Sequence, residues 1–111
     1  MNWINLEEEK QIEEIKNKSK LVPQVIFKHS TRCSASQLVK NRLERNTAPG
    51  DIDFYFLDLI RYRLVSNKIA EAFSIFHESP QVLLIRNEEC VYAESQLEIN
   101  MNELIEQSRQ N

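Results

Sequence analysis

The sequence predicts an α/β domain in which a four-stranded mixed sheet has helices on both faces, in the order α-β-α-β-α-β-β-α. Apolar runs rich in β-branched and aromatic residues alternate with segments of helical periodicity, which predicts parallel strands joined by right-handed crossovers. Only residues 86–89 separate the last two strands, so these are expected to form an antiparallel hairpin at the edge. Cys33 follows the first strand, and Ser79-Pro80 precedes the third.

The first half of the chain is expected to form two helices with a strand between them. Asn5, with Glu8 three residues later, has the pattern of a helix cap, and this helix runs to about residue 19. A strand over 24–28 follows Pro23, and the polar residues 29–32 form the turn after it. The second helix spans 34–46 and has one apolar face, formed by Ala35, Leu38, Val39 and Leu43.

The second half begins with a turn around Gly50 and a nearly continuous apolar run over 52–59, which is typical of a central strand covered on both faces. Strands over 81–85 and 90–93 form the hairpin, and Ser95 to Glu98 has the capping-box pattern that opens a last helix. Apolar residues at helical spacing mark the third helix (Val65, Ile69, Ala72, Phe73 and Phe76) and the inner face of the last (Leu97, Met101, Leu104 and Ile105).

Length and composition limit the class of protein. The 111 residues suffice for one domain, residues 1–111, and a net charge of −3 argues against nucleic acid as a partner. No apolar run is long enough to cross a membrane, and the N-terminus lacks the features of a signal peptide, so we expect a cytoplasmic protein with no membrane partner. With only Cys33 and Cys90 as cysteines, a disulfide-stapled scaffold is not expected.

Cys33 is the strongest candidate for chemistry because it lies where a strand gives way to a helix. Unpaired backbone N–H groups and the positive end of the helix dipole favour the thiolate there, and the thiolate is the form that attacks disulfides. A lone cysteine is more often a small buried apolar side chain, but the polar and cationic neighbours of Cys33 favour the reactive interpretation. Cys90, at the start of the predicted edge strand, is expected to be structural.

Ser36 stands where the second cysteine of a Cys-X-X-Cys pair would be. Its hydroxyl can donate a hydrogen bond to the Cys33 thiolate one helical turn away, but it cannot resolve a mixed disulfide. The predicted cycle therefore needs an outside thiol. Cys33 attacks a mixed disulfide, the client protein leaves reduced, and a free thiol then strips the adduct from Cys33. Catalytic roles are thus predicted for Cys33 and Ser36.

Other residues around this cysteine are predicted to bind the substrate. Arg32 immediately precedes the thiol and can pair with a carboxylate, and Ser34 follows it. His29 can move a proton, although a histidine at a strand end is often incidental. Lys28 is expected to be a solvated turn residue, and His77 a loop residue without a partner. No two cysteine or histidine residues have the spacing of metal ligands, so no metal site is predicted.

Ser79-Pro80 is expected to form the other half of the site. The predicted element order, with a cysteine after the first strand and an X-Pro bond before the third, is the layout of the thioredoxin superfamily. In that fold the X-Pro bond is typically cis and lies against the redox cysteine, and a cis bond costs little at proline. The backbone of Ser79 can then pair with an extended substrate as a β-strand does. An ordinary proline at the start of a strand is the alternative.

Three segments resemble the YtxJ-type, or monothiol bacilliredoxin, family, and the similarity runs over nearly the whole chain. They are Phe27-Lys28-His29-Ser30-Thr31-Arg32-Cys33, Tyr55 to Leu59, and Ser79-Pro80-Gln81. The resemblance implies a thioredoxin-like fold and one redox cysteine within a Thr-Cys-Pro-Ile-Ser segment. By position that segment falls on residues 32–36, where Cys33 and Ser36 match, Arg32 stands in place of threonine and Ser34 in place of proline.

The resemblance further implies that S-thiolated proteins are the clients in a thiol stress response. It also implies that no cofactor is bound and that bacillithiol, a small thiol with a malate group, is the co-substrate. Glutathione is less favoured because residues 93–95 lack the Gly-Gly of glutathione-binding glutaredoxins. Two alternatives remain open on the sequence. One is a non-catalytic thioredoxin-like module that binds a partner segment beside Ser79-Pro80, and the other is a monothiol reductase of the arsenate-reductase type with a different electron donor.

Overall fold

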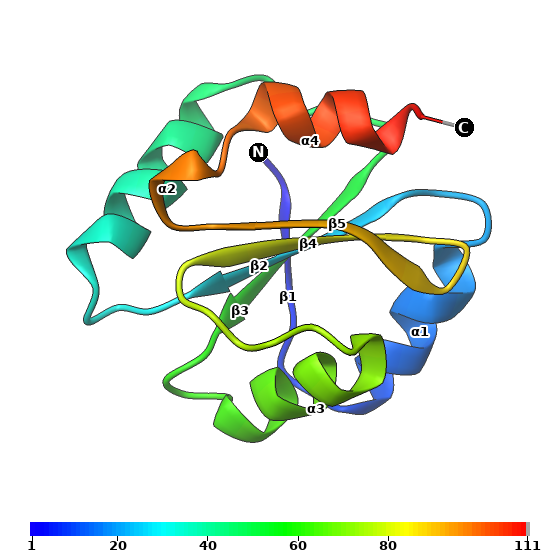
Figure 1. The fold of residues 1–111 in the computed structure, drawn as a ribbon, viewed down its shortest axis with the longest axis horizontal. Coiled ribbons are helices and arrows are strands. Elements are labelled where there is room, and N and C mark those ends of the chain that lie inside the picture. The colour runs from blue at the N-terminus through cyan, green and yellow to red at the C-terminus, as the bar shows by residue number, and fades with distance from the viewer. Residues whose placement is uncertain (111) are drawn as a thin grey trace.

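A computed structural model describes residues 1–110, in which a five-stranded mixed sheet lies between two layers of helices (Figure 1). The strands are β1 (Trp3–Asn5), β2 (Gln24–His29), β3 (Asp53–Asp58), β4 (Gln81–Arg86) and β5 (Glu89–Ser95). The helices are α1 (Lys10–Lys18), α2 (Ser34–Arg45), α3 (Arg63–Phe73) and α4 (Met101–Ser108), with a short 3-10 helix, η1 (Gln96–Glu98), before α4. The strand order is β1-β3-β2-β4-β5, and the predicted α/β class is confirmed.

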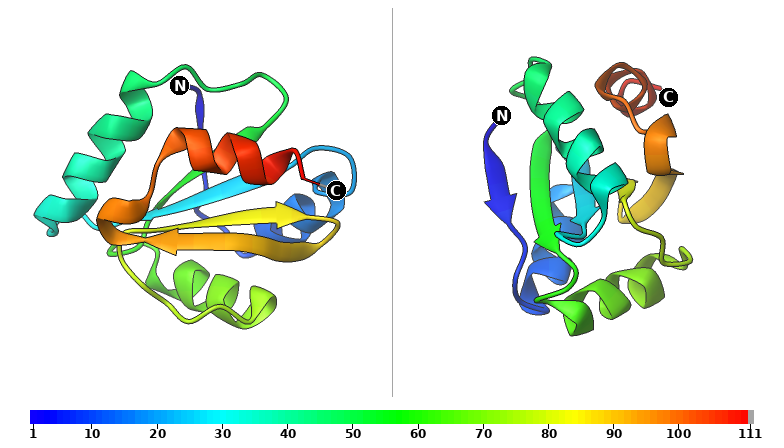
Figure 2. Two further views of the ribbon diagram at one scale, coloured as in Figure 1. Left: turned by 45° about the horizontal axis from the view of Figure 1, so that its top comes forward. Right: turned by 90° about the vertical axis from the view of Figure 1, so that its left-hand side faces the viewer.

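Buried apolar side chains cover both faces of the sheet. The helices α1 and α3 lie on one face, and α2 and α4 lie on the other (Figures 1 and 2). The central strand β2 is buried along its whole length, because both of its faces are covered. The core on the first face includes Ile15, Ile26, Leu57 and Ile69, and the core on the second includes Phe27, Val39, Leu84 and Leu104. Among residues 1–110, no helix has the length and apolar character needed to span a membrane.

The sheet has one strand more than the sequence predicts, because residues 3–5 form β1 instead of leading into a helix. β1 pairs in parallel with β3 at the edge of the sheet. Trp3 stacks on Phe27 with 5.7 Å between ring centroids, and its indole N–H donates to Glu44 Oε2 at 2.7 Å. A three-residue strand is too short for its alternation to be recognised in the sequence. Aromatic packing against the finished sheet is what selects this conformation.

The cap predicted for the first helix at Asn5 is wrong. Asn5 lies in β1, and α1 begins only at Lys10. The side chain of Gln11 organises the connection, since it donates to the Asn5 carbonyl at 2.9 Å and accepts from the amides of Glu7 and Glu8 at 2.8 and 3.0 Å. The hydrogen bonds to the turn before the helix therefore come from a glutamine inside the helix. A capping side chain at Asn5 was expected to make them.

The cap predicted for the last helix at Ser95 is also wrong. Residues 96–98 form only the short turn η1, and α4 begins at Met101. The side chain of Asn100 caps α4 by accepting from the Glu103 amide at 2.8 Å. The shift of the helix start leaves Leu97 51% exposed, whereas Met101 is buried as predicted.

Three further residues predicted to lie on apolar helix faces are exposed, namely Leu38, Ala72 and Phe76. The buried stripe of α2 runs through Ser36 and Val39, which turns Leu38 outward. Helix α3 ends at Phe73, where the following residue adopts a left-handed conformation, so Phe76 lies in the loop beyond it. Periodicity locates these helices correctly, but the packing of each helix on the sheet decides which stripe is buried.

β4 runs antiparallel to β2, whereas the alternation of strands and helices predicts a parallel strand. Residues 74–80 carry the chain from α3 back to the carboxyl end of β2, where Gln81 pairs with Lys28. β2 and β3 are parallel, and β4 and β5 form the predicted antiparallel hairpin. The return of the chain places Ser79-Pro80 at the same end of the sheet as the turn between β2 and α2 (Figures 1 and 2).

Candidate functional site

Cys33 is the N-cap residue of α2, at the helix start where the sequence predicts it. Its amide donates to the Ser30 carbonyl at 3.2 Å, and its carbonyl accepts from the Gln37 amide at 3.2 Å. The side chain is a half-buried free thiol. The first turn of α2 carries no acidic residue, so no carboxylate on this turn opposes the attraction of the helix N-terminus for a thiolate.

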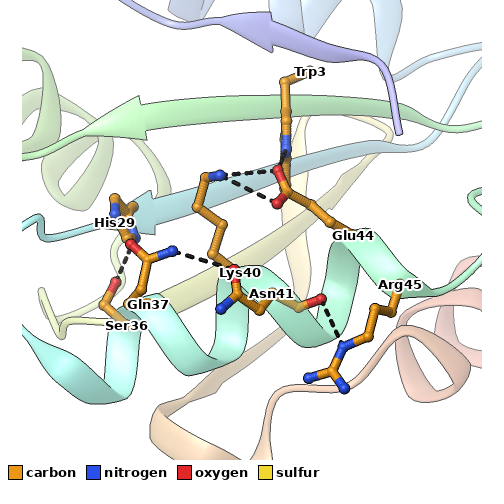
Figure 3. A network of polar contacts seen from close by, with 8 residues as sticks. All are labelled: Trp3, His29, Ser36, Gln37, Lys40, Asn41, Glu44 and Arg45. Carbon is orange, nitrogen blue, oxygen red and sulfur yellow. Dashed lines mark hydrogen bonds and ion pairs between the residues drawn. The ribbon is translucent and has the colours of Figure 1, made fainter.

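Ser36 is buried one turn into α2, and its hydroxyl contacts His29 (Figure 3). The distance from Ser36 Oγ to His29 Nδ1 is 2.7 Å, and Oγ also accepts from the Ser30 amide at 3.0 Å. Within the described part of the chain, residues 1–110, Ser36 Oγ has these two partners, and the expected hydrogen bond to Cys33 is not formed. When Nδ1 of His29 is unprotonated, the hydroxyl proton is donated to that nitrogen.

His29 is the last residue of β2 rather than part of the turn, and only 2% of it is exposed. Its ring packs against those of Phe27 and Phe56, with centroid distances of 5.7 and 5.3 Å. Burial lowers the pKa of His29, and the positive charge of Lys40 lowers it further. The imidazole is therefore neutral near neutral pH and is suited to accept the Ser36 hydroxyl proton. His29 and Ser36 form a buried pair beneath the Cys33 turn.

Lys28 is buried in β2, so the prediction of a solvated turn residue is wrong. Because the strand continues through residue 29, the Lys28 side chain shares the face of Ile26 and points to α3. Its ammonium group donates to the Ser66 carbonyl at 3.1 Å. Burial lowers the pKa of Lys28 to about 8.

His77 has partners that the sequence does not reveal. Its Nδ1 atom lies 3.4 Å from Lys28 Nζ and 3.4 Å from Ser66 Oγ. Burial lowers the pKa of His77, with a further contribution from the charges of Lys28 and Arg63. His77 belongs to the loop that leads to Ser79-Pro80, so this contact joins the loop to the central strand.

Ser79 and Pro80 lie beside the end of β2. Lys28 pairs with Gln81, and the same antiparallel register continued by one residue places Pro80 opposite His29. The Ser79-Pro80 peptide bond is cis. Among residues 1–110, the Ser79 hydroxyl is buried without a hydrogen-bond partner, and no acceptor is found for the Ser79 amide. The Ser79 carbonyl accepts from Gln96 Nε2 at 2.7 Å.

The structure gathers most of the predicted site residues at one end of the sheet. Arg32 and Ser34 are exposed on either side of Cys33, and Ser79-Pro80 lies at the neighbouring strand end. Gln96 joins this group although no sequence pattern predicts it. It adopts a left-handed φ angle of 57°, and such an angle at a non-glycine residue leaves no recognisable pattern in the sequence.

Cys90 lies at the opposite end of the sheet from Cys33. It pairs with Ile85, which in turn pairs with Gln24 at the start of β2. Gln24 and Lys28 are four steps apart along the extended strand, a distance of roughly 13 Å. The Cys90 thiol donates to the Tyr92 carbonyl at 3.4 Å, and burial raises its pKa. The structural role expected for Cys90 stays a prediction.

Comparison with known proteins relates this arrangement to redox proteins. Among solved structures, a candidate oxidoreductase with a thioredoxin fold is 28% identical, with a TM-score of 0.78 over 94% of this chain and 91% of the other. A thioredoxin of Malassezia sympodialis is 12% identical, with a TM-score of 0.75 over 96% of this chain and 91% of the other. A mutant thioredoxin of Halobacterium salinarum is 14% identical, with a TM-score of 0.72 over 97% of this chain and 91% of the other.

These likenesses confirm the predicted thioredoxin-like fold. A family model described as monothiol bacilliredoxin BrxC matches residues 4–104. The match includes the Cys33 turn, the Ser79-Pro80 loop and every strand of the sheet except the first residue of β1. Family and fold together support a thiol redox function. Because the family model matches residues 4–104, which include Cys33 at the start of α2, the chain belongs to the monothiol bacilliredoxin family.

Proposed function

We propose that this protein is a monothiol thiol–disulfide oxidoreductase that removes bacillithiol, or a related small thiol, from protein mixed disulfides. The observation that carries the proposal is the half-buried free thiol of Cys33 at the N-cap of α2, in a member of the bacilliredoxin family. Ser36 stands in place of a second cysteine, and Cys90 lies at the other end of the sheet. Both observations favour a cycle with one protein thiol.

In the first step, the Cys33 thiolate attacks the bacillithiol sulfur of the mixed disulfide. A new disulfide forms between Cys33 and bacillithiol, and the client sulfur leaves as a thiolate that takes a proton from water. The N-terminal amides of α2 stabilise the attacking thiolate. Arg32 is exposed next to Cys33, and we infer that its guanidinium pairs with a malate carboxylate of bacillithiol.

In the second step, the thiolate of a free bacillithiol attacks the bacillithiol sulfur of the adduct. Bacillithiol disulfide forms, and Cys33 leaves as a thiolate ready for another client. The two electrons that reduce the client therefore come from bacillithiol, and the protein needs no bound cofactor. In this scheme Ser36 is hydrogen-bonded to His29 and supports the turn between β2 and α2. A reducing cytoplasm with S-thiolated proteins is the compartment that fits this chemistry.

The proposal is tested by peptide-resolved mass spectrometry after the reduced protein meets bacillithiol disulfide and, separately, glutathione disulfide. We expect a rapid bacillithiol adduct confined to the Cys33 peptide and little glutathione adduct. Cys33→Ser removes the adduct, whereas Cys90→Ser, the matched control, leaves its rate nearly unchanged. Equal adducts from the two disulfides would remove the preference for bacillithiol. No adduct at Cys33 near neutral pH would contradict the enzyme and favour a non-catalytic module that binds partners beside Ser79-Pro80.

A further inference from the structure

Gln96 contacts both carbonyl groups of the Ser79-Pro80 unit. Its backbone amide donates to the Pro80 carbonyl at 3.0 Å, and its side-chain Nε2 donates to the Ser79 carbonyl at 2.7 Å. The residue is exposed and follows the last residue of β5. Its left-handed conformation, with φ of 57°, is uncommon for a residue with a side chain. Gln96 therefore closes over the Ser79-Pro80 loop from the side of β5, at the end of the sheet where β2 leads into the Cys33 turn.

The segment that carries Gln96 is tied to the helix that carries Cys33. The Arg42 guanidinium on α2 donates to the Leu97 carbonyl at 3.2 Å and to the Ile99 carbonyl at 2.8 Å. Figures 1 and 2 show η1 beside α2, at the end of the sheet where β4 begins. The contact between Gln96 and Ser79 is thus part of a connected frame.

Only one of the polar groups of Ser79 is hydrogen-bonded within the described part of the chain. Its carbonyl is engaged by Gln96, while its amide and its buried hydroxyl have no partner among residues 1–110. An extended peptide that adds to exposed strand backbone pairs with both the N–H and the C=O of a residue. At Ser79 such a peptide finds the N–H available and the C=O already bonded within the protein.

We propose that Gln96 is a specificity-determining residue that favours small disulfides over extended protein segments. An extended segment pairs fully with Ser79 only after the Gln96 side chain leaves the Ser79 carbonyl, whereas a small disulfide reaches Cys33 without this exchange. The inference rests on the proposed function of Cys33. Gln96 acts through Ser79 and has no part in breaking or forming bonds to sulfur.

The test compares the wild-type protein with Gln96→Met, which keeps the length of the side chain and removes its donor. Gln37→Met is the matched control, since Gln37 is an exposed glutamine near the start of α2 that does not contact Ser79. Rates of Cys33 adduct formation are measured with bacillithiol disulfide and with a short unstructured peptide whose single cysteine carries bacillithiol. For Gln96→Met we expect the peptide rate to rise about threefold to tenfold, the size of one net hydrogen bond, with the bacillithiol disulfide rate unchanged.

Equal changes with both substrates, no change, or a slower reaction with the peptide would overturn the inference about Gln96. If wild-type Cys33 reacts with neither substrate, the proposed function fails instead. Gln96 is then tested by the affinity of the same peptide for Cys33→Ser and for the double variant with Gln96→Met. We expect the double variant to bind about threefold more tightly or better, and equal affinities would overturn the inference.

Discussion

The ammonium nitrogen of Lys28 lies 3.4 Å from Nδ1 of His77, which joins a buried lysine of the central strand to the loop that carries Ser79-Pro80. The contact fits an ammonium donor and a neutral imidazole acceptor, since two positive charges at this distance repel each other. Burial lowers the pKa of both groups. The loop that carries Ser79-Pro80 is therefore connected to a pair of groups whose protonation depends on pH.

Lys28 is predicted to make the protein more stable as the pH rises in the alkaline range. Burial lowers its pKa from 10.5 to about 8, so between these values the unfolded chain binds more protons than the folded protein. Folding stability due to this group therefore increases with pH across that window. In urea unfolding experiments, the wild type should gain stability relative to Lys28→Met over this range. If the difference in unfolding free energy between the wild type and Lys28→Met does not change with pH, Lys28 has the same pKa in the folded and the unfolded state, which would contradict the prediction.

His77 is predicted to destabilise the protein in acid. Burial and the Lys28 charge lower its pKa in the folded state, so the unfolded chain takes up a proton first as the pH falls through about 6.5. Unfolding free energy measured from about pH 7 to about pH 5 should therefore fall more steeply for the wild type than for His77→Gln. In a Lys28→Met background this effect of His77 should be smaller. Parallel profiles for wild type and His77→Gln would contradict the assignment.

Ser36→Ala is predicted to destabilise the protein. The change leaves the Ser30 amide and the His29 ring nitrogen without their partner in a buried place, which costs about 1–3 kcal/mol of unfolding free energy. Ser34→Ala, an exposed serine in the same helix turn, is the control and should change stability by less than about 0.5 kcal/mol. Chemical denaturation measures both. Similar small effects for the two variants would mean that the buried pair contributes little.

Trp3→Ala is predicted to release β1 from the sheet. It removes the stacking on Phe27 and the hydrogen bond to Glu44, and we expect a loss of about 3 kcal/mol in unfolding free energy. Ile4→Ala is the matched control, because Ile4 lies in the same strand with 37% of its surface exposed. Faster amide hydrogen exchange at residues 54–56, which pair with β1, should accompany the loss in Trp3→Ala. Unchanged exchange there would show that β1 does not depend on the tryptophan.

The order of helices and strands after β1, the hairpin at the edge and the place of Cys33 at a helix start follow from the sequence alone. Each depends on periodicity or on the order of neighbouring residues, which local physical preferences determine. Ser79-Pro80 ahead of β4 is predicted for the same reason. The extra strand β1 escapes prediction because its three residues are ordered by Trp3 contacts with residues distant in the chain.

The tertiary structure alone decides how the polar side chains around the site are used. The burial of Lys28 depends on Ser66 and His77, which are 38 and 49 residues away, and the Gln96 contact with Ser79 spans 17 residues. Ser36 turns to His29 and not to Cys33 because the end of β2 brings the imidazole Nδ1 within 2.7 Å of the hydroxyl oxygen. The sequence thus predicts most of the residues that meet at this end of the sheet, with Gln96 as an exception. The packing of distant strands and loops determines which donor meets which acceptor, because a hydrogen bond depends on positions that chain order does not specify.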